Sequence, residues 1–332
     1  MTCITFKNHF IIIIMFKFMF EKIAILLIKN FQNFPTPGNF DNWEVFNHSD
    51  YLSGSSKVKK LFRLKSFLIR YNIEKNKKNS WLVKYFSSTV PLSEFKDSIV
   101  LDLGCFTGGR AISWAEDYSF KAIHGIDINP VFIKTCNEMA KKKKIRGNFK
   151  LAYGEKLPFR DNFFDYIVST DTFEHVQDIN KTVNECYRVL KPNGKLLVMF
   201  PQYLQPFESH LNFVTNLPFL HWFFSSKILS KIYFNIIKQR GNKATWYGLN
   251  KTKLDSWEKL PSINGTSFSK LKMIMNKSSF SAISYIHRPI LTDGRKSNML
   301  IFKILSLLFY PLIYIKYLQE YFLGRICFVA TK

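Results

Sequence analysis

The sequence has few cysteines, and their spacing points to no structural role. Its 332 residues include only Cys3, Cys105, Cys136, Cys186 and Cys327, with no CxxC pair and no His-flanked metal spacing. A disulfide framework or a structural zinc site needs such spacing. We therefore expect no disulfides, no bound metal and a reducing compartment, the cytoplasm.

Acidic residues are also scarce. The chain has 24 Asp and Glu against 48 Lys and Arg, a formal net charge of +24. This balance excludes a strongly basic partner and is compatible with an acidic one, either a nucleic acid or an anionic membrane surface. The alternative is a compositional bias in Lys, Phe and Ile that is spread over the whole surface and serves no partner.

No apolar run is both long and free of charges. Residues 10–28 are mostly apolar, but Lys17, Glu21 and Lys22 interrupt them, and no small-residue cleavage site follows. A spanning helix needs about 20 apolar residues with few charges. We favour an interfacial anchor, with a weak transmembrane helix or a translation start at a later methionine as alternatives.

A second apolar run, residues 299–315, lies close to the carboxyl end. Lys303 and Pro311 break it, and Lys316 follows. The run is a buried core helix, a lid, or a flap that faces a membrane.

Between these runs, the chain alternates between short apolar strands and helical periods. Strands are expected at 98–104, 122–128, 148–154, 164–170, 195–200, 281–289 and 325–332, and helices near 109–117, 130–143 and 178–190. Strands that are apolar throughout and joined by helices are typical of a parallel sheet covered on both faces.

A glycine-rich turn follows the first of these strands and leads into a helix. It reads DLGCFTGGR from Asp102 to Arg110. Glycine lets the backbone approach a ligand, and free N–H groups at a helix start favour an anionic group. The next strand ends at Asp127, 18 residues after Gly109. A carboxylate there can accept both hydroxyls of a ribose, or it can cap the helix that begins at Pro130.

Five separated blocks follow one another in a known order: VLDLGCFTGG, GIDINP, GEKLPF, FDYIVSTDTFEHV and YRVLKPNGKLL, within about residues 98–200. Together they resemble the class I S-adenosylmethionine-dependent methyltransferases, specifically the type 11 group that includes quinone-biosynthesis enzymes. A nicotinamide-binding protein would share only the first two blocks. The resemblance implies an α/β fold with a doubly wound, mostly parallel seven-stranded sheet of the Rossmann-like methyltransferase kind, whose last strand pair is antiparallel.

The resemblance also implies a division of the chain and a cofactor, S-adenosylmethionine. We expect an apolar segment and loop at 1–56, the cofactor-binding core at 57–200, an α-helical acceptor-binding cap at 201–279, and the last two strands with an apolar helical insertion at 280–332. Apolar helices are expected near both ends.

Cofactor-binding residues are implied at the carboxyl ends of the strands. In chain order they are Asp102, Gly104, Cys105, Gly108, Asp127, Ile128, Glu155, Leu157, Ser169 and Thr170. Asp102, Gly104 and Gly108 would shape the loop around the methionine part of the cofactor, and Cys105 belongs to the same turn. Asp127 would hold the ribose and Ile128 would pack against adenine. Glu155 and Leu157 would lie near the adenine ring, and Ser169 and Thr170 near the sulfonium.

The chain departs from the family pattern at two positions. Phe106 stands where the family usually has glycine, and Tyr153 stands where it often has an acidic residue that accepts from the adenine amino group. Adenine recognition would then rest on backbone groups or on stacking.

The expected activity is in-line methyl transfer, most simply to an oxygen. Because an oxygen acceptor must lose its proton, a histidine suits the task. His175 and His210 are equal candidates for this base, and either could instead be satisfied by a backbone carbonyl.

The acceptor is expected to be a small molecule or a lipid. The aromatic stretch Leu217–Ile237 is either a packing helix or the lining of an apolar pocket. With the two apolar runs and the positive charge, it favours a lipid-like acceptor taken from an anionic membrane surface by a peripheral protein. An RNA methyltransferase is the first alternative, since Lys57–Arg70 is basic and contains aromatic residues. A binding protein without catalysis is the second.

Overall fold

The computed structural model describes most of the chain, in two units. The described residues are 56–77, 80–206, 217–225, 227–231, 264–292 and 299–332, together with Met19, Lys22, Ile23 and Leu26. Residues 1–52 and 206–261 form one unit, and residues 53–205 and 262–332 form the other. The second unit carries the sheet.

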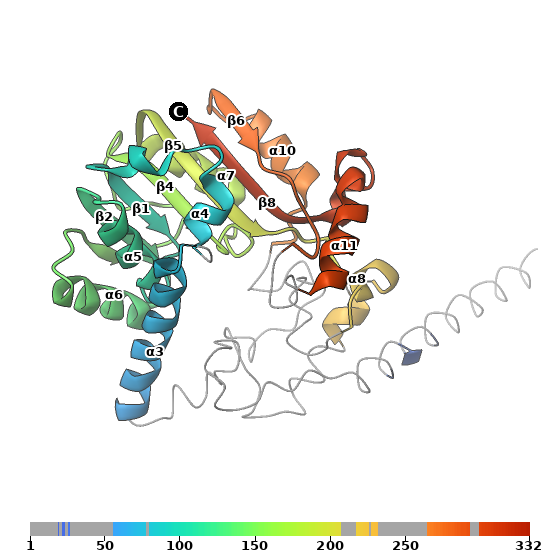
Figure 1. Cartoon of the computed structure of the whole chain (residues 1–332), viewed down its shortest axis with the longest axis horizontal. Coiled ribbons are helices and arrows are strands. Elements are labelled where there is room, and N and C mark those ends of the chain that lie inside the picture. Colours follow the sequence, from blue (N-terminus) through green and yellow to red (C-terminus); the bar gives the residue numbers. More distant parts are fainter. Residues whose placement is uncertain are drawn as a thin grey trace, which may run out of the picture. The chain divides into compact units, whose positions relative to one another are not determined.

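The described residues of the second unit form one eight-stranded sheet, in the order β3-β2-β1-β4-β5-β8-β6 with β7 beside β8 (Figure 1). The strands are β1 (Ile99–Leu103), β2 (Ala122–Asp127), β3 (Phe149–Leu151), β4 (Phe164–Thr170), β5 (Leu190–Pro201), β6 (Ala282–Tyr285), β7 (Arg288–Pro289) and β8 (Leu323–Thr331). β1 to β5 run parallel, and β8 is antiparallel to both β5 and β6. The mostly parallel sheet and its antiparallel end confirm the expected fold. The count is eight rather than seven, because the strand expected at 281–289 is divided into β6 and the two-residue β7.

Helices cover both faces of this sheet. The bounds are α3 (Ser56–Lys75), α4 (Trp81–Phe86), α5 (Gly109–Asp117), α6 (Pro130–Lys142), α7 (Ile179–Val189) and α10 (Phe268–Asn276), with a 3₁₀ turn η2 (Leu92–Phe95). Apolar side chains of α3, α4, α5 and α6 pack in one core cluster, and those of α7 and α10 pack in another. Adjacent residues of β1 alternate between the clusters, with Val100 in the first and Leu101 in the second, as a sheet buried on both faces requires.

Local capping explains where two of these helices begin. The Asn129 side chain accepts from Val131 N at 2.9 Å, and Pro130 occupies the first turn of α6. The Asp178 side chain accepts from Lys181 N at 3.1 Å at the start of α7. Both caps satisfy N–H groups that a helix leaves unpaired, so the two helices start at defined points next to the strand ends.

The segment between β7 and β8 contains α11 (Leu300–Phe309), the 3₁₀ turn η7 (Tyr310–Tyr314) and α12 (Gln319–Phe322). Pro311 lies at the start of η7, which explains why α11 ends there. Every side chain of α11 is at least partly exposed. A buried core helix, one of the three interpretations of the run at 299–315, is therefore wrong.

The domain boundaries expected from the sequence stay a prediction. Residues 264–276 fall within the expected cap, yet α10 buries Phe268, Leu271 and Met275 in the core of the second unit. In the first unit, the described part of Leu217–Ile237 contains α8 (Leu220–Phe223) and helical residues 227–231.

The apolar run at 10–28 lies mostly outside the described residues. Within it, Met19, Ile23 and Leu26 are helical and exposed. Within the described ranges, no helix combines the length and the apolar character that a membrane span requires.

Asp165 on β4 offers a test of how the sheet is held together. Its carboxylate accepts from Ile99 N of β1 at 2.8 Å and from Lys191 Nζ of β5 at 2.7 Å. Asp165→Ala removes both bonds and should lower the free energy of unfolding by about 1–3 kcal/mol, the range for hydrogen bonds to charged groups. Chemical denaturation measures the change. Asp161→Ala is the control, because its carboxylate is 67% exposed in its pair with Arg188. Equal effects of the two substitutions would contradict the role given to Asp165.

Candidate active site

The glycine turn lies at the carboxyl end of β1, between β2 and β4. The N–H groups of Gly104 and Cys105 both donate to Ile126 O of β2 at 2.9 Å. Gly104 and Gly108 have φ angles of 84° and 79°, in the left-handed region that favours glycine. A Cβ on Gly104 would collide with the Thr172 hydroxyl beyond β4, and one on Gly108 would lie 2.9 Å from Cys136 Sγ of α6. The turn therefore has to be glycine because neighbouring elements approach it closely.

Asp127 joins the end of β2 to this turn. Its Oδ2 accepts from Phe106 N and its Oδ1 from Asn129 N, each at 2.9 Å. Burial raises the pKa of Asp127 to about 6, although these backbone donors lower it. A carboxylate offers about four acceptor positions, so the backbone donors of Phe106, Asn129 and Ile128 leave it able to accept further hydrogen bonds. This fits the two hydroxyls of a ribose. Capping of α6, the alternative role for Asp127, is provided by Asn129. Asp127 is therefore left for the ribose.

Phe106 occupies the position where a glycine is usual, and it adopts a glycine-like conformation with a φ angle of 50°. Its ring centroid lies 4.2 Å from that of Phe132 on α6 and 4.5 Å from the Arg70 guanidinium of α3. Contacts with two helices offset the cost of the left-handed backbone. The substitution of phenylalanine for glycine thus adds packing between the turn and its flanking helices.

The side where adenine is expected presents exposed apolar side chains. Ile128 and Tyr153 are 58% and 60% exposed, just beyond the ends of β2 and β3. These strand ends are joined, since Asp127 pairs with Leu151 and its backbone carbonyl accepts from Ala152 N at 3.2 Å. Exposed apolar groups at this edge are suited to a flat ring.

Glu155 and Leu157 have structural contacts. The Glu155 carboxylate accepts from Gln177 N at 2.6 Å and from Asp178 N at 3.2 Å, just ahead of α7. The Leu157 side chain is buried in the core, and its N–H donates to Glu185 at 2.7 Å. Their proximity to adenine stays a prediction.

The residues at the ends of β1 and β4 are buried and already bonded within the protein. The Ser169 hydroxyl donates to Leu103 O at 3.0 Å, and the Thr170 hydroxyl accepts from Arg110 Nη1. Asp102 is 2% exposed, and its burial raises its pKa to about 7. Cys105 is also buried, with its Sγ 3.9 Å from that of Cys136. These side chains shape the floor of the site.

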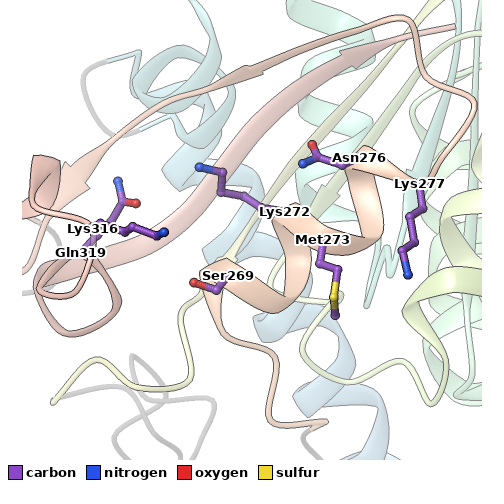
Figure 2. A pocket seen from close by; sticks show the side chains of 7 residues that line it. All are labelled: Ser269, Lys272, Met273, Asn276, Lys277, Lys316 and Gln319. Atoms are coloured by element: carbon purple, nitrogen blue, oxygen red, sulfur yellow. The ribbon is translucent and has the colours of Figure 1, made fainter.

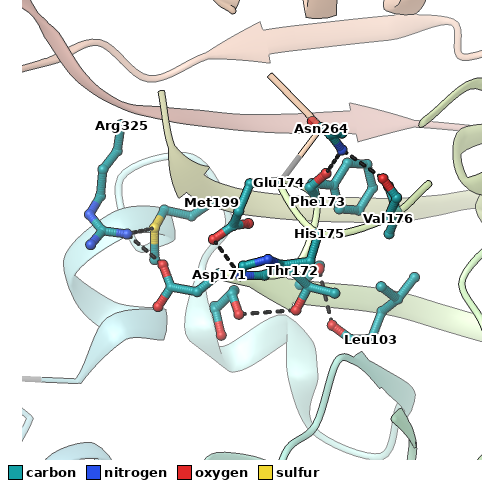
Figure 3. Close-up of polar contacts among 12 residues, drawn as sticks. Leu103, Asp171, Thr172, Phe173, Glu174, His175, Val176, Met199, Asn264 and Arg325 are labelled. Carbon is teal, nitrogen blue, oxygen red and sulfur yellow. Dashed lines mark hydrogen bonds and ion pairs between the residues drawn. The ribbon is translucent and has the colours of Figure 1, made fainter. Parts of the chain in front are cut away.

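A largely buried ion network, in which the Asp171 side chain is 33% exposed, adjoins the end of β4, and Figure 3 shows its Arg325–Asp171 pair. Arg325 Nη1 of β8 lies 2.6 Å from Asp171 Oδ1, and Arg110 of α5 lies 3.8 Å from Asp171 Oδ2 and 3.6 Å from Glu74 Oε1. Both guanidiniums lie over the Trp81 ring, Arg110 at 4.2 Å and Arg325 at 5.0 Å from its centroid. Burial alone raises the pKa of Asp171, but Arg325 and Arg110 bring it below its ordinary value. The two guanidiniums balance two carboxylates, so this buried group is neutral overall.

His175 lies in the turn that follows β4. Its backbone N–H donates to Thr172 O at 2.8 Å, and its imidazole Nε2 lies 3.6 Å from Glu174 Oε1 (Figure 3). Asn264 holds this turn through bonds to Phe173 O at 2.7 Å and to Val176 O at 2.8 Å. Burial lowers the pKa of His175 to about 4, although the nearby Asp171 raises it. The imidazole is therefore neutral near pH 7. His210, the other expected base, lies outside the described residues.

The structure thus brings one group of expected residues together at one edge of the sheet: Asp102, Gly104, Cys105, Gly108, Asp127, Ile128, Ser169, Thr170 and His175. The sequence analysis assigned no role to Arg70, Arg110, Asp171 or Arg325. Arg110 directly follows the first quoted block and Asp171 lies inside the fourth, so a charged residue among apolar ones was the available signal in the sequence. Arg325 lies 154 positions from Asp171, so only the fold pairs them.

Comparison with known proteins agrees with this geometry. Residues 101–198 match the family described as "Methyltransferase domain". Phosphoethanolamine N-methyltransferase 3 of Arabidopsis thaliana is 37% identical over 99 residues, which cover 30% of this chain and 20% of that protein. Demethylmenaquinone methyltransferase of Listeria welshimeri is 31% identical over 142 residues, which cover 40% of this chain and 60% of that protein.

A solved structure shows the same fold. Phosphoethanolamine N-methyltransferase 2 of Haemonchus contortus, in complex with S-adenosyl-L-methionine, aligns with a TM-score of 0.51 and 17% identity over 87% of this chain and 60% of that chain. Residues 101–198 of this chain therefore correspond to a methyltransferase domain, and the described strands and helices have the fold of such enzymes. The matches with the two curated relatives span 20% and 60% of those proteins' lengths, so the relation concerns this domain.

Asp171→Asn tests the buried network. The substitution leaves the Arg325 guanidinium facing a neutral amide that is one-third exposed, and losing a hydrogen bond between charged groups costs about 1.5–3 kcal/mol. We expect a loss of this size in the free energy of unfolding, measured by chemical denaturation. Asp161→Asn, which weakens an exposed pair, should cost less than about 1 kcal/mol. A loss of only that size in Asp171→Asn would contradict the network's role.

Proposed function

We propose that the chain is an active S-adenosylmethionine-dependent methyltransferase that methylates an oxygen of a small or lipid-like acceptor. The observation that carries the proposal is the Asp127 carboxylate, bonded to Phe106 N at 2.9 Å beside the glycine turn. This carboxylate can still accept from a ribose. It lies at the carboxyl ends of the parallel strands, close to the point where the strand order reverses, which is the usual ligand site of such sheets.

The electrostatics of the site favour a cationic ligand. Burial raises the pKa of Asp102 to about 7 and that of Asp127 to about 6, so keeping both carboxylates ionised is costly. A nearby positive charge offsets that cost. The sulfonium and ammonium groups of S-adenosylmethionine have the required sign.

The cofactor, when bound, supplies an activated methyl group, so the protein mainly has to position two molecules. Asp127 would hold the ribose, and the glycine turn would admit the methionine part. His175 would accept the acceptor's proton, with Glu174 3.6 Å away to orient the imidazole. His210 is an equal candidate for that role.

The acceptor class follows from the relatives and from the surface. One relative is named for phosphoethanolamine and another for demethylmenaquinone, which supports a small-molecule acceptor. We propose a lipid-like acceptor that the protein reaches as a peripheral protein at an anionic membrane surface. The net charge of +24 supports this part of the proposal.

Labelled S-adenosylmethionine tests the acceptor class. A cell extract incubated with the protein and the labelled cofactor is separated into lipid, RNA and small-molecule fractions. We expect the label in the lipid or small-molecule fraction. Label in RNA would favour the RNA methyltransferase instead, and cofactor binding without any transfer would favour the inactive binding protein.

Asp127→Asn tests the ribose contact. Calorimetry should show binding of S-adenosylmethionine weakened at least about tenfold, because an amide cannot accept as two carboxylate oxygens do. Ribose hydroxyls favour the ionised carboxylate, so the native protein's affinity should fall as the pH drops through about 6. The variant should lose that dependence. Asp161→Asn is the control, and an unchanged affinity in Asp127→Asn would refute the assignment.

His175→Gln tests the proposed base. With the acceptor identified above, kcat should fall about 100-fold, the lower range for general base catalysis. Because burial lowers the pKa of His175 to about 4, the native enzyme's kcat at saturating cofactor should stay level from about pH 7 to about pH 5. His124→Gln, on β2 among phenylalanines, is the control. Unchanged kcat in His175→Gln would assign the proton transfer elsewhere.

A further inference from the structure

The helix α11 exposes an apolar stripe. Leu300, Ile304, Leu307 and Leu308 are 73%, 46%, 71% and 64% exposed. Their spacing of four, three and one residues puts them on one face of the helix. A surface helix of a protein surrounded only by water normally has polar side chains on that face.

The exposed stripe belongs to a segment that is firmly attached to the second unit. Ile313 of η7 is fully buried, and the rings of Phe309 and Phe322 lie 5.1 Å apart. The Glu320 carboxylate of α12 accepts from Phe268 N at 3.0 Å and also from Ser269 N, at the start of α10. The segment therefore buries its own apolar anchors and still exposes the stripe.

Tyrosines follow the stripe. Tyr310, Tyr314 and Tyr317 are 46%, 60% and 79% exposed, and the Tyr310 and Tyr314 hydroxyls lie 3.0 Å apart. A tyrosine has an apolar ring and a polar tip, which suits the boundary between hydrocarbon and lipid headgroups.

A cationic pocket lies next to these tyrosines in the chain (Figure 2). Its volume is about 380 Å³, and its lining residues are Ser269, Lys272, Met273, Asn276, Lys277, Lys316 and Gln319. Figure 2 shows Lys316 and Gln319 across from Lys272 and Ser269 of α10. The lysines, with hydroxyl and amide groups beside them, offer the donors that bind a phosphate group.

We propose that α11, η7 and this lysine pocket form a docking surface for an anionic phospholipid bilayer. The apolar stripe enters the outer edge of the hydrocarbon, the tyrosines lie at the headgroup level, and the lysines bind lipid phosphates. Ten residues of helix span only about 15 Å, half the thickness of the hydrocarbon core, so α11 lies in the plane of the interface. The inference deepens the membrane association proposed above and is independent of methyl transfer.

Vesicle sedimentation of the full-length protein tests the docking surface. The vesicles are phosphatidylcholine alone or mixed with phosphatidylserine, at low and high salt. We expect binding to the anionic vesicles that weakens with salt. Leu307→Ser/Leu308→Ser should weaken it at least about tenfold, because two leucines no longer enter the bilayer. Lys272→Gln/Lys316→Gln should weaken binding to the anionic vesicles about fivefold per lysine. Binding to vesicles of phosphatidylcholine alone should not change.

Two matched variants serve as controls. Lys141→Gln/Lys142→Gln removes two exposed lysines at the end of α6, and Leu64→Ser/Leu68→Ser removes two leucines of α3 that are 39% and 41% exposed. Both should bind vesicles as the native protein does. Vesicle binding that survives the α11 substitution, or that is lost equally in either control, would overturn the proposal.

Ultracentrifugation and calorimetry separate the other outcomes. If ultracentrifugation shows that the native protein is a dimer and that Leu307→Ser/Leu308→Ser dissociates it, the stripe binds a second copy of the chain. That result would contradict the proposal. Unchanged calorimetric binding of S-adenosylmethionine in both docking variants is expected. Loss of cofactor binding there would show that the substitutions act on the fold, which would also count against a docking surface.

Discussion

The bond between the Asp127 carboxylate and Phe106 N is the contact on which the site depends. It ties the end of the second strand to the turn after the first strand, next to the place between β1 and β4 where the order of the strands reverses. The backbone bonds from Gly104 and Cys105 to Ile126 O already hold the turn against β2, and this contact adds the carboxylate itself. With it, the turn and the carboxylate form one cradle whose remaining acceptor positions face a ligand.

The rest of the unit supports this cradle at some cost. Phe106 holds a left-handed backbone, Asp102 is a buried carboxylate with a raised pKa, and Asp171 is paired with arginines inside the protein. Buried charges and strained residues persist only where surrounding contacts determine them, and they concentrate at functional sites. Their presence at the carboxyl ends of β1 and β4 is what a binding site predicts, and a purely structural sheet would have little use for them.

The sheet and the cradle could be predicted because local sequence determines them. Apolar strands, helix periods and the DLGCFTGGR turn are all local signals, and the observed strands lie within the expected ranges or close to them. The network of Glu74, Arg110 and Arg325 could not be predicted, since its members come from three distant elements. Nor could the exposure of α11, because an apolar helix has the same sequence whether it packs in a core or on a lipid surface.

The most direct test of the account is a crystal structure of the protein with S-adenosylhomocysteine. The account predicts both ribose hydroxyls within hydrogen-bond distance of the Asp127 carboxylate, the adenine beside Ile128, and the sulfur near the end of β4. A ligand whose ribose lies away from Asp127, or a glycine turn closed against the ligand by Phe106, would contradict it.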